Sequence, residues 1–340
     1  MANPVAWAAT MLLDRTSSGD GVAIQAPAKV NLTLRVLGRR ADGYHELESV
    51  VAALDWCDTL VLRPAPGLTL AVRGYAVPDG DENLVMRAAR SLQGACGSRA
   101  GARIALWKRI PPGRGLGGGS ADAAAALVGL NALWGAGLST ERLADLGAAI
   151  GSDVPFFFGP PLSVMRGRGE RIEPIQARPP WWFVVAWSEG AKATAEVYAA
   201  LDRLGGPALG GTPAAIAAGV VSSRRSRTHG CCAAVAPRPD ATDILKILGG
   251  PPAAAAPYLV NDLEAAAANV RLKDISMRQV LERAGATAIG MTGSGPAYFA
   301  LADTRKQARA WARAAKAQHV QTQVAQLTRG DRQQENTPCN

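Results

Sequence analysis

Hydrophobic and polar positions alternate along the first part of the chain and then recur at helical spacing. Alternation is typical of a strand with one buried face, whereas apolar residues three and four apart are typical of an amphipathic helix. Strands are predicted at residues 22–38, 48–64, 68–75 and 102–110, with Pro27 interrupting the first and a turn at 55–58 dividing the second. Helices are predicted at residues 82–97, 120–135 and 139–151, the last one capped by Ser139.

The second half of the chain carries a different pattern. A buried strand is predicted at 181–187, helical structure at 261–286, two strands around a glycine turn at 286–303, and an amphipathic helix at 304–318. Residues 205–257 are rich in Gly, Ala and Pro and are interpreted as an insertion or a poorly ordered loop. Strands and helices do not alternate strictly, which favours an α+β fold over a doubly wound parallel sheet.

The length of the chain predicts two modest hydrophobic cores. We place an N-terminal domain at 21–178 and a C-terminal domain at 179–325, the latter containing the insertion near 205–257. Residues 1–20 are expected to form a disordered extension, and residues 326–340 a tail.

Composition narrows the class of partner. Hydrophobic residues make up 48% of the chain and charged residues 19%, and the formal net charge is +9. Part of the positive excess lies in local runs such as Arg224, Arg225 and Arg227, so it indicates solvated charge or an anionic substrate. Only 5% of residues are aromatic, and no basic stripe contains aromatic residues, which argues against a nucleic-acid partner.

Cysteine usage and hydropathy bear on location. The five cysteines, at 57, 96, 231, 232 and 339, have the spacing of neither a zinc site nor a disulfide framework, which fits a reducing cytoplasm. Residues 1–10 are apolar but lack the basic residues that open a signal peptide, and no apolar run is long enough to span a bilayer. We therefore expect a cytoplasmic protein that does not contact membranes.

The stretch PPGRGLGGGSADAAAAL, residues 111–127, carries the strongest chemical signal. It matches the dinucleotide fingerprint G-x-G-x-x-G, but no second strand follows to supply the acidic residue that binds a ribose. It also comes close to a Walker A loop, but Gly119 stands where that loop has lysine. Both loop types are therefore disfavoured.

A different phosphate-binding loop remains. Several glycines let backbone N–H groups turn towards phosphate oxygens, and Ser120 can cap the following helix, whose N-terminus adds donors and partial positive charge. The alternative is a flexible turn before an Ala-rich helix, although a bare turn needs only one or two glycines.

Residues 111–127 resemble the second motif of the GHMP kinases, which phosphorylate small molecules such as galactose, homoserine, mevalonate and phosphomevalonate. APAKVNLTLRV at 26–36 resembles the first motif of that family, and AIGMTGSGPAYFAL at 288–301 resembles its third, in the family's order. The resemblance implies a two-domain GHMP-kinase-like α+β fold with the active site in the interdomain cleft.

Within the family, the resemblance narrows to members that phosphorylate the 2-hydroxyl of 4-diphosphocytidyl-2-C-methyl-D-erythritol in the non-mevalonate isoprenoid pathway. RADGYHEL at 40–47, IGSDVPFFF at 150–158 and VNDLE at 260–264 carry it. It covers roughly residues 21–200 and 258–310, and the chain departs from it at Arg114, where a small residue is common, and in the insertion.

The resemblance implies that Asp153 takes the proton of the acceptor hydroxyl and that Lys29 keeps Asp153 ionised. Without it, Asp153 could equally cap a turn before Pro155, and Lys29 could be a solvated strand residue. The residues expected to bind ATP are Pro111, Pro112, Gly113, Arg114, Gly115, Leu116, Gly117, Gly118, Gly119, Ser120 and Ala121. Mg²⁺ is expected to enter with ATP and to contact Ser120, since the sequence shows no metal-binding cluster of its own.

The substrate side is implied in the same way. Tyr44 and Tyr198 are expected to stack on cytosine and His45 to read its polar edge. The complete substrate-binding set is Asn31, Tyr44, His45, Thr194, Tyr198, Gly293 and Ser294. The expected partner is the small cytidyl diphosphate substrate, bound by a monomer or a homodimer. A homoserine or mevalonate type of kinase and a non-catalytic nucleotide-binding relative are the alternatives.

Overall fold

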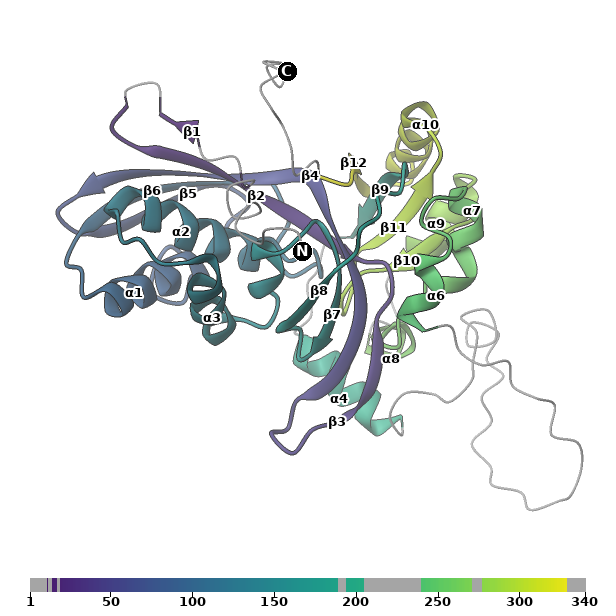
Figure 1. Cartoon of the computed structure of the whole chain (residues 1–340). Helices are drawn as coiled ribbons and strands as arrows, with labels where there is room; N and C mark the ends of the chain where they lie inside the picture. The colour runs from purple at the N-terminus through teal and green to yellow at the C-terminus, as the bar shows by residue number, and fades with distance from the viewer. Residues whose placement is uncertain are drawn as a thin grey trace, which may run out of the picture.

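The computed structural model describes residues 11, 14–16, 19–188, 194–204, 240–270 and 277–328. Two β-sheets organise this part of the chain (Figure 1). The larger contains β1 (Asp14–Arg15), β2 (Val22–Asn31), β3 (Arg35–Arg39), β4 (His45–Ala65), β5 (Leu68–Gly74), β6 (Gly101–Lys108), β7 (Leu162–Gly167) and β8 (Arg171–Pro174). The smaller contains β9 (Trp182–Trp187), β10 (Ile289–Met291), β11 (Tyr298–Ala302) and β12 (Gln321–Gln326).

The long strand β4 is the spine of the larger sheet. It pairs with β2 and β6 at one end and with β3 and β7 at the other. The predicted turn at 55–58 is therefore wrong, because β4 continues through it. The two aspartates that suggested a turn have partners instead: Asp55 accepts a hydrogen bond from the backbone of Gln326, and Asp58 pairs with Lys108.

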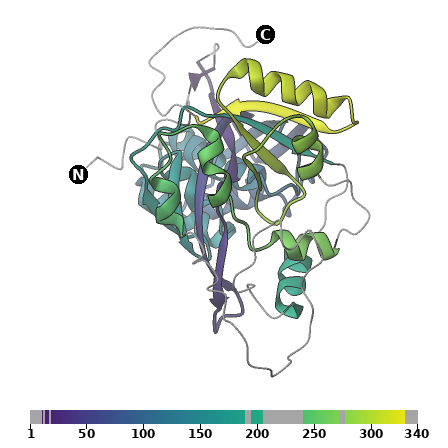
Figure 2. The ribbon, with the colours of Figure 1, turned by 90° about the vertical axis from the view of Figure 1, so that its right-hand side faces the viewer.

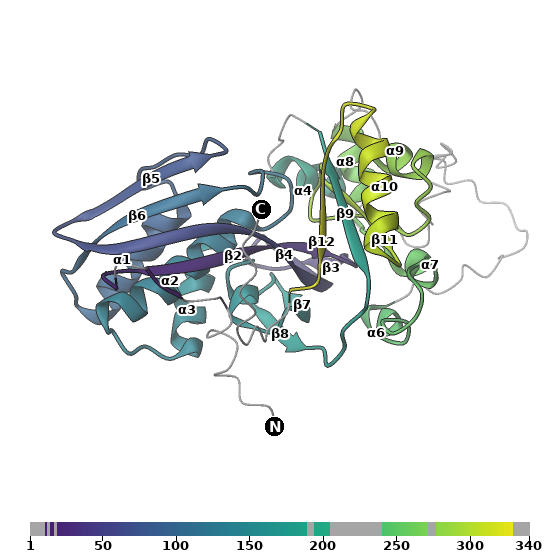
Figure 3. The same ribbon diagram turned by 90° about the horizontal axis from the view of Figure 1, so that it is seen from above.

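Helices cover one face of the larger sheet near β2, β4, β5 and β6. They are α1 (Leu84–Cys96), α2 (Gly118–Trp134) and α3 (Thr140–Ile150). All three were predicted, and Ser139 caps α3 by accepting a hydrogen bond from Arg142 N, as expected. The expected cap by Ser120 is wrong, because α2 already begins at Gly118 and its N-cap position is Gly117. Seen from above, the opposite face of β4, β5 and β6 carries no helix of the described chain (Figure 3).

The smaller sheet carries α10 (Arg305–Lys316) and α9 (Met277–Arg283) on one face (Figure 2). Its other face packs on the larger sheet through a shared core, in which Trp56 of β4 stacks on Trp187 of β9 with ring centroids 5.4 Å apart. Below this joint, α4 (Thr194–Arg203) packs against α8 (Glu264–Val270). The strands β7, β8 and β12 and the 3₁₀ turn Pro155–Phe158 were not predicted.

Parts of the expected disorder are ordered. Met11 is buried and β1 pairs with β2, within the region expected to be a disordered extension. The last part of the expected insertion forms the short helices α6 (Ala241–Leu245) and α7 (Pro252–Ala255). Residues 1–10, 205–239 and 329–340, on which the remaining expectations fall, lie outside the described residues. The domain limits at 178 and 179 stay a prediction.

Candidate active site

The glycine loop connects the end of β6 to the start of α2. Gly113, Gly115 and Gly117 have φ angles of +68°, +74° and +67°, a backbone conformation that other residues adopt only with strain. A pocket of about 300 Å³ opens over the loop and is lined by its residues from Pro111 to Ser120. Ala121, also expected to bind ATP, is fully buried in α2 and is not among the lining residues.

Close packing behind the loop explains why glycine is required. A Cβ atom on Gly117 would lie 2.7 Å from Lys29 Cγ, and one on Gly118 would lie 2.8 Å from Lys108 Nζ. The loop backbone thus passes directly over two lysines. An open pocket floored by glycine N–H groups at a helix N-terminus fits a polyphosphate.

Lys108 forms a buried ion-paired cluster below the loop. Its ammonium pairs with Asp58 and lies 2.9 Å from Asp122 Oδ2, and all three side chains are buried. Asp58 Oδ1 also accepts a hydrogen bond from Ile110 N at 2.8 Å, which ties the entry of the loop to β4. Sequence reasoning missed this cluster, although Lys108 is the one charged residue on the buried face of β6, whose other buried residues are apolar.

Burial and ion pairing shift the pKa values of two groups in this cluster, Asp122 and Lys108. Burial raises the pKa of Asp122 to about 8, only partly opposed by Lys108. Burial works against the charge of Lys108, but its two carboxylate partners outweigh burial and raise its pKa. Asp122 and Lys108 both line the pocket over the loop, so the cluster forms part of the pocket wall.

Lys29 and Asp153 lie side by side, as the sequence led us to expect. Lys29 Nζ is 3.3 Å from Asp153 Oδ2, with the lysine side chain 4% exposed and the aspartate side chain 37% exposed. Lys29 also donates to Asn31 Oδ1 at 2.7 Å, and its backbone N–H donates to Leu116 O of the loop. A partly exposed carboxylate next to a buried ammonium is suited to receiving a proton.

Asn31 joins three segments that are far apart in the sequence. Its Oδ1 accepts from Lys29 Nζ and from Gly293 N at 2.9 Å, and its Nδ2 donates to Ser49 Oγ at 2.8 Å. The Thr292 hydroxyl accepts from Asn31 N and lies 3.1 Å from Gly115 O, to which it can donate. Asn31, expected to contact substrate, thus positions Lys29 between the glycine loop and the 292–295 turn, and Ser49 and Thr292 were not anticipated.

Among the expected substrate residues, Tyr198 and His45 contact one another, and Tyr44 contacts Arg168. Tyr198 stacks on His45, with ring centroids 4.9 Å apart and 27° between the planes, and His45 Nε2 lies 2.9 Å from Asp202 Oδ1. Tyr44 is 54% exposed, and the Arg168 guanidinium carbon lies over its ring, 4.9 Å from the ring centroid.

Two further features complete this side of the site. Thr194 Oγ1 lies 3.1 Å from Ser294 Oγ, which links α4 to the 292–295 turn. Burial, together with the nearby charge of Asp153, raises the pKa of the Tyr198 hydroxyl. Tyr198, in the middle of α4, is thus within electrostatic reach of Asp153.

The described ranges contain no cluster of three or more His, Cys, Asp or Glu side chains arranged to hold a metal ion. In the same ranges, no helix has both the length and the apolar character needed to cross a bilayer.

Comparison with known proteins assigns the fold. The GHMP kinases N terminal domain matches residues 83–159, and the GHMP kinases C terminal domain matches residues 260–321. A crystal structure of 4-(cytidine 5'-diphospho)-2C-methyl-D-erythritol kinase is 35% identical, with a TM-score of 0.67 over 89% of this chain and 99% of that one. The Methanococcus jannaschii mevalonate kinase has a TM-score of 0.63 at 13% identity, over 92% of this chain and 99% of that one, and shares the fold. The chain is therefore a GHMP kinase, an ATP-dependent small-molecule kinase with an α+β fold.

Sequence relatives narrow the family further. A protein of Pelotomaculum thermopropionicum is 42% identical over 286 residues, which cover 84% of this chain and 90% of the relative. One of Salinispora tropica is 40% identical over 297 residues, covering 85% of each chain. Both are named 4-diphosphocytidyl-2-C-methyl-D-erythritol kinase, and the chain belongs to their family. The resemblance drawn from the sequence is confirmed.

Proposed function

We propose that this chain transfers the γ-phosphate of ATP to the 2-hydroxyl of 4-diphosphocytidyl-2-C-methyl-D-erythritol. The observation that carries the proposal is the Lys29–Asp153 pair, 3.3 Å apart, with Lys29 in contact with the glycine loop at Gly117. The substrate class follows from the family to which the chain belongs.

The residues of the chain divide the chemistry among them. Asp153 accepts the proton of the acceptor hydroxyl as that oxygen attacks phosphorus. Lys29 pairs with Asp153 and offsets the negative charge that develops between acceptor and phosphate. The loop N–H groups between Gly115 and Ser120 hold the phosphate oxygens in line, and ATP supplies the transferred phosphoryl group.

Mg²⁺ is the ion we expect with the nucleotide. The Ser120 hydroxyl lies in the first turn of α2 and lines the pocket, so it is the protein group placed to contact such an ion. The described residues contain no group of three or more His, Cys, Asp or Glu side chains arranged to hold a metal ion, so we expect the phosphates themselves to supply the other ligands.

The acceptor is held on the side of α4. His45, stacked on Tyr198, forms an aromatic wall beside Asp153, and Tyr44 offers an exposed ring near it. In the substrate complex we expect the cytosine ring to displace Arg168 from Tyr44 and to stack there. Thr194 and Ser294 are expected to bind the remaining polar groups, while the monomeric or dimeric state and the cytoplasmic location stay predictions.

Release of ADP with a panel of acceptors tests the substrate. We expect turnover with the cytidyl substrate, and none with homoserine, mevalonate or the methylerythritol phosphate that lacks the cytidyl group. Faster turnover of homoserine or mevalonate would assign the chain to another activity of the superfamily.

Asp153→Asn tests the catalytic base. The rate should fall about 10²- to 10⁴-fold, the usual loss when a general base is removed, while ATP affinity stays within a few-fold. Asp145→Asn on α3 is the matched control, since the Asp145 side chain is 73% exposed and forms an ion pair with Arg142 of the same helix, 3.9 Å away. Near-normal turnover of Asp153→Asn would remove Asp153 from the chemistry.

A further inference from the structure

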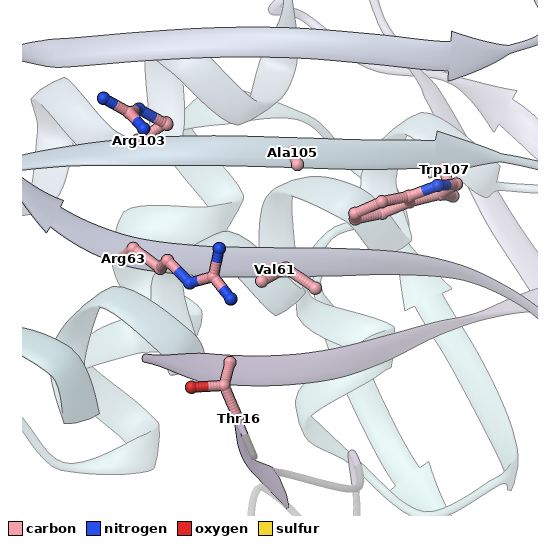
Figure 4. A pocket seen from close by; sticks show the side chains of 6 residues that line it. All are labelled: Thr16, Val61, Arg63, Arg103, Ala105 and Trp107. Carbon is pink, nitrogen blue, oxygen red and sulfur yellow. The ribbon is translucent and has the colours of Figure 1, made fainter. Parts of the chain in front are cut away.

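The face of the larger sheet opposite α1, α2 and α3 holds a second depression, away from the glycine loop. Figure 4 shows the residues that line it: Thr16, Val61, Arg63, Arg103, Ala105 and Trp107. Its volume is about 300 Å³, at the lower end of the range for small-ligand sites. The lining residues come from β4 and β6, with Thr16 at the rim after β1.

The strand register concentrates positive charge there. Arg63 of β4 lies directly opposite Arg103 of β6, and Arg73 of β5 lies directly opposite Trp107. Like charges at directly opposed positions of a sheet destabilise it, so the pairing of Arg63 with Arg103 is unfavourable without an anion between them. Both arginines are exposed, and the Arg63 side chain is 49% exposed.

Carboxylates neutralise this charge only in part. Asp20, in the turn before β2, lies 3.6 Å from Arg63, and that carboxylate is shared with the Thr16 hydroxyl. Arg103 makes no ion pair with any residue that the structure describes. No acidic side chain lies on the outward face of β4, β5 and β6 around the depression, where these strands are fully described. The side chains there are Thr59, Val61, Arg63, Thr69, Ala71, Arg73, Arg103, Ala105 and Trp107.

An apolar floor lies beside the arginines. Val61 and Ala105 are opposite one another between the Arg63–Arg103 pair and Trp107. The Trp107 ring is half-buried, and the Arg73 guanidinium lies over it, 5.8 Å from the ring centroid. The face therefore presents the guanidinium groups of Arg63 and Arg103 at one end and an apolar, aromatic surface at the other.

We propose that this face binds an organic phosphate, with the phosphate held by Arg63 and Arg103 and the organic group lying on Trp107. Guanidinium groups bind phosphate oxygens in a bidentate manner, and two of them side by side match a dianion. The small side chains of Val61 and Ala105, between the two guanidinium groups and the Trp107 ring, leave room for an aromatic or short alkyl group. A second copy of this chain is a poor occupant, because an isologous contact would set arginine against arginine.

Fluorine NMR of protein labelled with 5-fluorotryptophan tests the site, with Trp107→Phe identifying the Trp107 signal. Phenyl phosphate is the probe, and phenol and inorganic phosphate are the comparisons, all at one ionic strength. We expect a saturable shift of the Trp107 signal by phenyl phosphate, about ten-fold weaker binding of inorganic phosphate, and no saturable shift with phenol.

Charge removal then locates the binding. Arg63→Gln with Arg103→Gln should weaken phenyl phosphate binding at least ten-fold, leave ADP formation unchanged and not lower the melting temperature, since it removes two like charges that face each other. Arg309→Gln with Arg313→Gln, two exposed arginines of α10, removes the same charge elsewhere and should change nothing. If the Trp107 signal still shifts in the variant that carries Arg63→Gln and Arg103→Gln, binding at the glycine loop is its source and the proposal is overturned. The absence of any shift in the unaltered protein would also overturn it.

Discussion

Asp122 carries a proton at neutral pH because its carboxyl is buried next to a second carboxyl, Asp58. Only one ammonium, that of Lys108, serves both acids. Burial, and the neighbouring Asp58 carboxyl as well, therefore favour the neutral form of Asp122, which limits the charge held in the interior. That charge is sensitive to pH.

Asp122→Asn should remove a pH dependence of stability. The pKa of Asp122 is about 8 in the folded chain against an ordinary value of 3.8, so between those values the folded chain holds a proton that the unfolded chain has lost. The contribution of Asp122 to the free energy of unfolding is therefore fully present below pH 4 and is lost as the pH rises towards 8. Melting curves from pH 5 to 8.5 should show the wild type losing stability relative to Asp122→Asn. The loss should be on the order of 1 kcal/mol per pH unit. A difference that stays constant with pH would contradict the assignment.

Tyr44→Ala should weaken the cytidyl substrate and leave ATP nearly unaffected. Tyr44 is 54% exposed, so its ring does not support the core, and loss of a base–aromatic stack costs about 1–3 kcal/mol, or roughly 5- to 150-fold in affinity. Steady-state KM values for both substrates and the melting temperature are the measurements. Tyr44→Phe keeps the ring and should be mild. An unchanged KM for the cytidyl substrate in Tyr44→Ala would exclude stacking.

Single elements show which sequence patterns are sufficient. The helices α1, α2, α3 and α10 were predicted because apolar spacing and caps such as Ser139 are local signals. The turn at 55–58 was wrong because aspartate in a strand normally indicates a turn, and only the tertiary partner Lys108 explains Asp58. β12 was missed because its residues QTQVAQ are polar on one face and gain order only by pairing with β9.

The start of α2 gives a prediction at the scale of one element. Gly117→Ala should lower ATP affinity and the rate together, because its Cβ would lie 2.7 Å from Lys29 Cγ and 3.1 Å from Phe157 Cζ. Gly97→Ala is the matched control, since Gly97 also has a positive φ, +61°, but has nothing within 4 Å. Both changes should cost about 1 kcal/mol of stability from backbone strain. Equal activity of the two variants would show that the space beside Lys29 is not required.

At the scale of the whole molecule, the site exists only where the two sheets meet. Lys29, Gly115 and Gly293 come from three segments, and the hydrogen bonds of Asn31 and Thr292 join them. The family and its fold were predicted from motifs, and both are confirmed. This network was not predicted, because a threonine next to a glycine turn carries no local sign of partners that lie far away along the chain.

Thr292→Val should impair catalysis more than it impairs folding. The change removes the hydroxyl next to Gly115 O and Asn31 N, and a buried polar group left unpaired costs about 1–3 kcal/mol. Thr322→Val is the matched control, because the Thr322 hydroxyl, on β12, is also buried but donates to Ala312 O of α10. Measured kcat and ATP affinity should fall for Thr292→Val alone, while a parallel loss in both variants would point to general destabilisation.

The order of strands in the smaller sheet has a consequence for synthesis on the ribosome. β9, with the sequence WFVVAW, lies between β11 and β12, so both of its neighbours are made later than it is. The first of them follows about 110 residues after β9, which at about 5–20 residues per second takes on the order of 5 to 20 seconds. For that interval a strongly apolar strand with two open edges is attached to a growing polypeptide. Slow codons or a shortage of chaperone during this window should therefore reduce the yield of native protein more than the same disturbance during synthesis of α10.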